Sequence, residues 1–436
     1  MGWEDIYRAK LVSPEEAVSR INPGDRVFYP VGGSAPLGLV NALSRRLPEL
    51  GHITFITGIV VYPFEYLMKP EYKEYFKHYT LFHFNGERAA VNQESIEPYL
   101  VQFNRIEDLL TNHAKPNVML CECAPPDERG YFSYGIFGTY CNHMVKEMVS
   151  KIIVQVNSRA PYVYGRQNMI HISEVDHVVE QDHELFEIPD IPIADVETKI
   201  AGYLAERIED GSVLQIGVGG LANAVCSFLE SKKDLGVHTE MLADSFLDLI
   251  EKGVINGRRK TFHPGEVTCC FGPTKRAFYD FVHKNQMFKY YPIIYTNDPY
   301  NVARNDNMVA INNALMVDLT GQVCAESLGF KQYSGTGGQL DFVRGAAKAK
   351  NGQSFITLPS SVNGKAEIAS RIVLTLPPGQ AVTTTRTDVD KVVTEFGIAE
   401  LKNRSITERV KEMLKIAHPQ FREELQFEAK KAGLLN

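Results

Sequence analysis

Short apolar runs alternate with helix-like segments along almost the whole chain, and this alternation constrains the fold more than any other feature. The helix-like segments, such as 37–47, 200–208 and 405–415, carry apolar residues three and four positions apart. Strand-sized apolar runs lie at 26–31, 53–56, 118–121, 151–155, 212–216, 293–295, 354–357 and 392–393. Strands and helices that alternate in this way form largely parallel sheets. The sequence therefore predicts an α/β protein.

A weak internal repeat indicates how this protein is divided. Segments 24–33 and 210–220 each run from a turn through an apolar strand to a glycine loop that precedes an amphipathic helix. A chain of 436 residues is also long enough for two domains. The proline-containing stretch 185–197 suits an extended connector. We expect two similar open α/β domains, 1–188 and 189–436, with the active site in the cleft between them.

Composition and charge exclude several classes of function. The net charge of -7 argues against general binding to nucleic acid or to an anionic membrane. The first residues carry charges throughout and lack the apolar stretch of a secretory signal, and no apolar run is long enough to span a membrane. The seven cysteines and twelve histidines show no metal-ligand spacing. We expect a cytoplasmic protein without a metal site.

Two glycine-rich loops are candidate ligand sites. Segment 215–220 follows a strand and precedes a helix, where glycines bring backbone N–H groups close to a ligand. Segment 334–345 has three glycines within four residues, followed by Gln339 and Asp341 as possible polar contacts. Both segments can bind a phosphate-rich or acyl-bearing ligand, and both can instead be structural turns.

Two charged side chains near these loops can carry chemistry. Glu240 has apolar and glycine neighbours within 236–244, and a carboxylate in such surroundings can act as nucleophile or general base. A capping or surface role for Glu240 stays open. Lys365 follows a turn, where it can contact a phosphate as a point charge or simply be exposed.

Together these segments resemble the acetyl-CoA hydrolase/transferase family of glutamate-dependent CoA transferases. The resemblance covers nearly the whole chain and is closest to the branch of 4-hydroxybutyrate and butyryl-CoA:acetate CoA-transferases. The motifs that carry it, in this order, lie at 24–27, 127–133, 215–219, 238–241, 311–322, 334–342 and 394–401. The family's Ile-Asn-Ser pattern reads Ile311-Asn312-Asn313 here, which leaves a role for residue 313 open.

The resemblance implies a site and a reaction. Glu240 would be the nucleophile that forms a thioester with CoA, and Gly338 would border that thioester. The remaining CoA-contacting residues would be Gln215, Ile216, Gly217, Val218, Gly219, Leu315 and Lys365. The substrates would be acyl-CoA and short-chain carboxylates, with no permanently bound cofactor. A homodimer or a dimer of dimers is expected by the same resemblance.

Two alternatives to CoA transfer remain at this point. In an acyl-CoA hydrolase, water rather than a second carboxylate would attack the glutamyl intermediate, and sequence does not show whether water is excluded. A non-catalytic CoA-binding regulator would keep the glycine loops but would not need Glu240.

Overall fold

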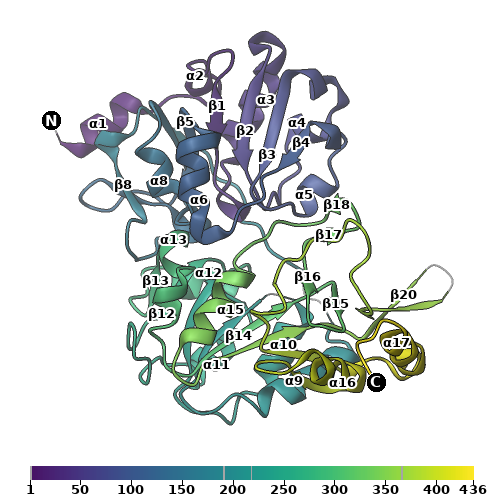
Figure 1. The fold of residues 1–436 in the computed structure, drawn as a ribbon. Coiled ribbons are helices and arrows are strands. Elements are labelled where there is room, and N and C mark those ends of the chain that lie inside the picture. Colours follow the sequence, from purple (N-terminus) through teal and green to yellow (C-terminus); the bar gives the residue numbers. More distant parts are fainter. Residues whose placement is uncertain (1, 190–191, 218, 365–366) are drawn as a thin grey trace. The chain divides into compact units, whose positions relative to one another are not determined.

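A largely parallel sheet forms the centre of each of two units in the computed structural model, which describes residues 2–189, 192–217, 219–364 and 367–436 (Figure 1). The first unit comprises Met1–Ile188 and Thr268–Thr296, and the second comprises Pro189–Val267 and Asn297–Asn436. Helices connect the strands in both units. The predicted α/β class and largely parallel sheets are thereby confirmed.

The first unit contains seven parallel strands in the order β4-β3-β2-β1-β5-β7-β9. These strands are β1 (Arg26–Phe28), β2 (Ile53–Thr57), β3 (Phe76–Thr80), β4 (Ile96–Pro98), β5 (Val118–Cys123), β7 (Lys151–Val156) and β9 (His177–Glu180). Its helices include α1 (Trp3–Lys10), α2 (Pro14–Val18), α3 (Leu37–Leu50), α8 (Asn142–Lys146) and α12 (Arg276–Val282). The α3 helix buries Leu39, Val40, Leu43 and Leu47 in the same apolar core as Val27 of β1. Their spacing of three and four residues gives the helix its apolar face.

The second unit has strands in the order β11-β10-β14-β19-β23-β24, of which only β24 pairs antiparallel to its neighbour. These strands are β10 (Val213–Ile216), β11 (Gly236–Met241), β14 (Met308–Asn313), β19 (Gln353–Thr357), β23 (Lys391–Thr394) and β24 (Gly397–Glu400). Its helices are α9 (Asp195–Ala205), α10 (Gly220–Ser227), α11 (Phe246–Glu251), α14 (Pro299–Val302), α15 (Gln339–Lys348), α16 (Ile406–Ile416) and α17 (Pro419–Lys431). No helix in the described part of the chain is long and apolar enough to cross a bilayer.

Both sheets have a point from which the strand order runs in two directions. In the first sheet β1 lies between β2 and β5, and in the second sheet β10 lies between β11 and β14. The pairings Val27–Val118 and Val213–Met308 place β1 and β10 in matching positions. The two predicted strands of the repeat, 26–31 and 212–216, contain these two strands. Ligands of open α/β sheets bind outside the carboxyl ends of the strands at such a point.

One predicted strand is wrong. Residues 293–295 belong to the helical turn α13 (Ile293–Thr296). The N–H groups of Tyr295 and Thr296 both donate to the Pro292 carbonyl, which closes the turn. A three-residue apolar run is too short for its periodicity to distinguish a strand from a helical turn. The other seven predicted runs lie at β1, β2, β5, β7, β10, β19 and β23.

Candidate active site

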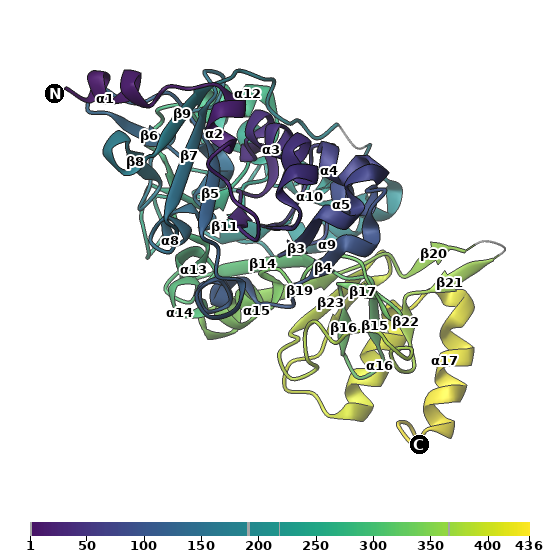
Figure 2. The ribbon, with the colours of Figure 1, turned by 90° about the horizontal axis from the view of Figure 1, so that it is seen from above.

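The carboxyl ends of four neighbouring strands define the candidate site in the second unit. Ile216 ends β10, Met241 ends β11, Asn313 ends β14 and Thr357 ends β19. Because the four strands are parallel, these residues lie along one edge of the sheet. Helix α15 packs against β14 and β19 (Figure 2). The loop that leads into α15 therefore reaches the same edge.

Glu240 is the carboxylate at this edge. It is the penultimate residue of β11 and is partly buried. The Asn297 side-chain Nδ2 donates to Glu240 Oε2 at 2.6 Å, and the Gly338 N–H also donates to the carboxylate. Burial raises the pKa of Glu240 from 4.5 to about 7, although both hydrogen bonds lower it. A carboxyl group with this pKa is partly ionised near neutral pH and more basic than a solvated one.

Gly338 lies directly against this carboxyl group. A Cβ atom built on Gly338 would be 2.0 Å from Glu240 Oε2 and 2.1 Å from Asn297 Nδ2. The φ angle of Gly338 is -98°, a value that any residue adopts. Close approach, not backbone conformation, is therefore the reason for a glycine at this position. Gly338 is also the N-cap of α15, so the positive end of that helix faces the carboxylate.

Asn297 was not identified from the sequence. It is fully buried, and its Oδ1 atom has no hydrogen-bond partner among the described residues. It precedes Asp298, whose side chain accepts the Tyr300 N–H as the N-cap of α14. The run Asn-Asp-Pro is thus typical of a helix start, and nothing in it indicates a contact with residue 240.

Two side-chain amides join β10 and β14, the neighbouring strands at the point where the strand order changes direction. Asn312 Nδ2 on β14 donates to Gln215 Oε1 on β10 at 3.0 Å, and Gln215 Nε2 donates to Asn312 Oδ1 at 3.3 Å. Gln215 is buried, as is Ile216 beside it. Of the predicted CoA-contacting residues, Gln215 therefore joins the ends of β10 and β14, and Ile216 beside it is buried where the glycine loop begins.

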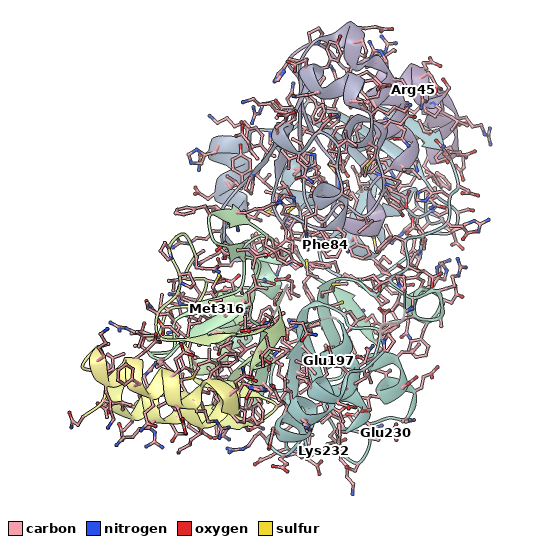
Figure 3. All side chains as sticks on the ribbon, turned by 90° about the vertical axis from the view of Figure 1, so that its right-hand side faces the viewer. Arg45, Phe84, Glu197, Glu230, Lys232 and Met316 are labelled. Carbon is pink, nitrogen blue, oxygen red and sulfur yellow. The ribbon has the colours of Figure 1, made fainter. Side chains whose placement is uncertain are left out.

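The first glycine loop has space around its backbone. A Cβ atom on Gly217 would meet nothing closer than Asn313 Nδ2 at 4.0 Å, and one on Gly219 would meet nothing within 4 Å. Gly219 has φ +112°, which L-residues with side chains rarely adopt. Gly220, the first residue of α10, differs because a Cβ atom there would be 2.4 Å from Glu197 Oε2. Glu197, labelled in Figure 3, belongs to α9. Because its carboxylate lies against Gly220, it is at the N-terminus of α10.

Side chains beyond β14 connect this edge to α15. Asn313 Oδ1 accepts a hydrogen bond from Thr357 Oγ1 at 2.7 Å, and the Asn313 carbonyl accepts one from Gln339 Nε2 at 2.8 Å. Leu315 follows in the chain and is partly buried, with its N–H donating to the Cys324 carbonyl. Met316, labelled in Figure 3, is the next residue and pairs with Cys324.

Two predicted site residues, Val218 and Lys365, lie outside the described residues. The structure therefore brings Glu240 and Gly338 into contact and places Gln215, Ile216, Gly217, Gly219 and Leu315 around the same strand ends. Among the described residues, no three His, Cys, Asp or Glu side chains gather as a metal-binding group. The arrangement is a basic carboxylate faced by two hydrogen-bond donors, which suits nucleophilic attack followed by stabilisation of an oxyanion.

Family models match both halves of the chain. Residues 2–189 match the model described as the acetyl-CoA hydrolase/transferase N-terminal domain. Residues 274–429 match the model of the acetyl-CoA hydrolase/transferase C-terminal domain.

Individual relatives match over the full length. The 4-hydroxybutyrate coenzyme A transferase of Clostridium kluyveri is 40% identical, covering 99% of this chain and 100% of that protein. The butyryl-CoA:acetate CoA-transferase of Anaerostipes caccae is 36% identical, covering 100% and 99%. The crystal structure of RipA from Yersinia pestis matches with a TM-score of 0.92 and 35% identity, and all of both chains is covered.

Proposed function

This chain belongs to the acetyl-CoA hydrolase/transferase family, and from that membership we propose that it is an acyl-CoA:carboxylate CoA transferase with Glu240 as nucleophile. The relatives from Clostridium kluyveri and Anaerostipes caccae transfer CoA to or from 4-hydroxybutyrate, butyrate and acetate according to their names. We extend that class to this chain: its substrates are CoA thioesters and short-chain acids of the acetate, butyrate or 4-hydroxybutyrate type.

One observation carries the role of Glu240: its carboxyl group faces Gly338, which has no side chain to block it, and Asn297, which donates to it. A carboxylate that served only as a structural acid would be expected to pair with a cation or cap a helix. In the described residues Glu240 forms no salt bridge. Its raised pKa also makes it a stronger nucleophile than a solvent-exposed glutamate.

The proposed transfer proceeds through a mixed anhydride, a glutamyl-CoA thioester and a second mixed anhydride. The Glu240 carboxylate attacks the acyl-CoA carbonyl, the C–S bond breaks, and CoA leaves as a thiolate while a mixed anhydride forms. The thiolate attacks the glutamyl carbonyl of the anhydride, which releases the first acid as a carboxylate and leaves a glutamyl-CoA thioester. The second acid then attacks this thioester, and the same steps run in reverse. The energy of the thioester is thereby retained.

Each of these attacks passes through a tetrahedral centre that carries negative charge on oxygen. We propose that the Gly338 N–H and Asn297 Nδ2 stabilise that charge when it develops on the glutamyl carbonyl, because they already donate to the carboxylate. Donors held in place before the reaction need no reorganisation during it.

The CoA-contacting residues are proposed from the resemblance of the glycine-loop motifs to the family. We propose that Gln215, Ile216, Gly217, Val218, Gly219 and Leu315 contact the uncharged pantetheine arm and that Lys365 contacts a phosphate. The Glu197 carboxylate at the start of α10 supports this assignment, since a phosphate at that helix end would meet a negative charge.

Four further features remain proposals made from the sequence. The functional division lies between residues 188 and 189, with the C-terminal domain 189–436 carrying the nucleophile and the CoA-binding loops. The protein works in the cytoplasm as a homodimer or a dimer of dimers. CoA is a substrate, and no cofactor is permanently bound.

Mass spectrometry tests the covalent mechanism. After incubation with acetyl-CoA or butyryl-CoA, the peptide that contains Glu240 should carry a CoA adduct. Borohydride should reduce this thioester to an alcohol. A Glu240→Gln variant should show neither product. An unmodified Glu240 peptide in the wild-type protein would overturn the proposal and favour a non-catalytic CoA-binding protein.

Acid dependence distinguishes transfer from hydrolysis. A transferase should exchange labelled acetate into acetyl-CoA by ping-pong kinetics, and thioester loss should be slow when no acid is added. Thioester cleavage without acid at a comparable rate would identify a hydrolase instead.

A further inference from the structure

Gln339 is held at both ends of its side chain. It is the first residue of α15 and follows Gly338 directly. Its Nε2 atom donates to the Asn313 carbonyl at 2.8 Å, and its Oε1 atom accepts from Thr384 Oγ1 at 3.1 Å. A carbonyl can only accept, so the amide nitrogen must face Asn313 and the amide oxygen must face Thr384. The orientation of the carboxamide is therefore determined.

The two residues that hold Gln339 are fixed themselves. Asn313 ends β14, and its side chain accepts from Thr357 at the end of β19. Thr384 is fully buried. Its carbonyl accepts the Val323 N–H at 3.1 Å, and its own N–H donates to the Val323 carbonyl at 3.3 Å. Gln339 thus links the start of α15 to Asn313 at the sheet edge on one side and to the buried Thr384 on the other.

This link lies next to a glycine-rich backbone segment whose last carbonyl, that of Gly338, also accepts the Phe342 N–H at 3.1 Å. Three of the four residues from Gly335 to Gly338 are glycines, and glycine has more accessible backbone conformations than any other residue. The N–H that reaches Glu240 belongs to the last of them. A shift of that peptide would lengthen the hydrogen bond to the carboxyl group. Gln339 is the residue directly after Gly338, and its side chain is held by two hydrogen bonds.

We infer that Gln339 is a positioning residue, which holds the Gly338 N–H against the reacting carboxyl group of Glu240 through its bonds to Asn313 and Thr384. The inference rests on the proposed role of Glu240. Gln339 makes no hydrogen bond to Glu240, so it acts through Gly338 and is not itself a catalytic residue.

The test uses a nearly isosteric change. Gln339→Glu keeps the size of the side chain but places a carboxylate oxygen against the Asn313 carbonyl, which abolishes that bond. We expect kcat to fall about 10- to 100-fold, less than the roughly 10²- to 10³-fold for outright loss of an oxyanion donor, with KM for acyl-CoA changed less than about threefold. The acidic limb of the kcat profile should move to higher pH. Gln339→Ala should show the same shift without the added charge.

The control variant is Gln353→Ala. Gln353 begins β19, at the opposite end of that strand from Thr357, and its Nε2 atom donates to the Arg207 carbonyl at 3.4 Å. The Gln353→Ala variant therefore loses a similar side chain-to-carbonyl bond away from the site. Its kcat and pH profile should match those of the wild-type protein.

The outcomes separate this inference from the proposed function. If the wild-type protein forms the Glu240 adduct and both Gln339 variants form it at the same rate with an unchanged pH profile, the positioning role is overturned alone. A loss of kcat with an unmoved pH profile and a large drop in Tm would assign Gln339 a merely structural role and overturn the inference too. If the wild type forms no adduct, the proposed function fails and the inference fails with it.

Discussion

The backbone of Gly338 and the carboxyl group of Glu240 approach so closely that no side chain fits between them. A Cβ atom on Gly338 would lie 2.0 Å from Glu240 Oε2, well inside van der Waals contact. Neither group can be displaced freely, because Glu240 belongs to strand β11 and Gly338 caps α15. This close approach leads to one prediction for Gly338 and one for Glu240.

Gly338→Ala should remove most activity. The added methyl group must push aside either the Glu240 carboxyl group or the Asn297 amide, which breaks the donor arrangement. We expect kcat to fall about 10²- to 10³-fold in steady-state assays. Gly202→Ala is the control, since Gly202 is in α9 and a Cβ atom there meets nothing within 4 Å. It should leave kcat unchanged and stabilise the fold by up to about 1 kcal/mol. Wild-type activity in Gly338→Ala would show that the close approach has no role in the reaction.

Glu240→Gln should be more stable than the wild-type protein at alkaline pH. The pKa of Glu240 rises from 4.5 to about 7 on folding, so the folded state holds its proton more tightly than the unfolded state does. Stability therefore falls as pH increases from about 4.5 through 7, and the neutral glutamine avoids this loss. We expect equal unfolding free energies near pH 4 and a gain of roughly 1–3 kcal/mol for the variant above pH 7. Thermal denaturation across this pH range checks the sign. A difference that did not depend on pH would mean that Glu240 has an ordinary pKa.

The fold could be predicted from the sequence because its signals are local. The period of the apolar residues distinguishes strands from helices, and alternation of the two implies parallel sheets. The 293–295 run failed because three residues have no measurable period. The glycine loops stand out by their glycine density, whereas Glu240 was singled out as the nucleophile only by the resemblance of the surrounding motifs to the family.

The support around Glu240 could not be predicted because it depends on residues far apart in the chain. Asn297 is 57 positions from Glu240, and the two residues that hold Gln339 are 26 and 45 positions from it. An asparagine before Asp-Pro is typical of a helix start, and a glutamine after glycines is typical of an exposed polar residue. One sequence contains no distance that would distinguish these roles from the observed ones.

Asn297→Ala should move the pH dependence of the reaction. The nucleophile must be ionised, so activity increases as pH rises through the pKa of Glu240, which is about 7. Asn297 lowers that pKa by donating to the carboxylate, so its removal should raise the pKa and shift the acidic limb to higher pH. We expect kcat at pH 7 to fall about 10²- to 10³-fold, with partial recovery at pH 9.

A matched control for this variant is Asn112→Ala. Asn112 lies in the first unit and also donates its Nδ2 to a carboxylate, Asp108 Oδ1, at 2.6 Å, but on an exposed surface. Its kcat profile should superimpose on that of the wild type. An acidic limb that stays in place in Asn297→Ala would show that the Asn297 bond does not influence the reacting carboxylate.

The amide pair Gln215–Asn312 should couple the stability of β10 and β14. Each single alanine variant removes the bonds between the two amides, at a cost of about 1–2 kcal/mol, because the remaining part-buried amide loses hydrogen bonds but keeps its desolvation cost. The double variant should lose less than the sum, with a coupling energy of about 0.5–1.5 kcal/mol.

The only tryptophan, Trp3, lies in the first unit, so its fluorescence would not follow this sheet. Hydrogen exchange of the peptides that contain β10 and β14 gives the free energies directly. Because Gly217 follows Gln215 by two residues, KM for acyl-CoA should also rise in both single variants. Strictly additive free energies would mean that the two amides stabilise their strands independently.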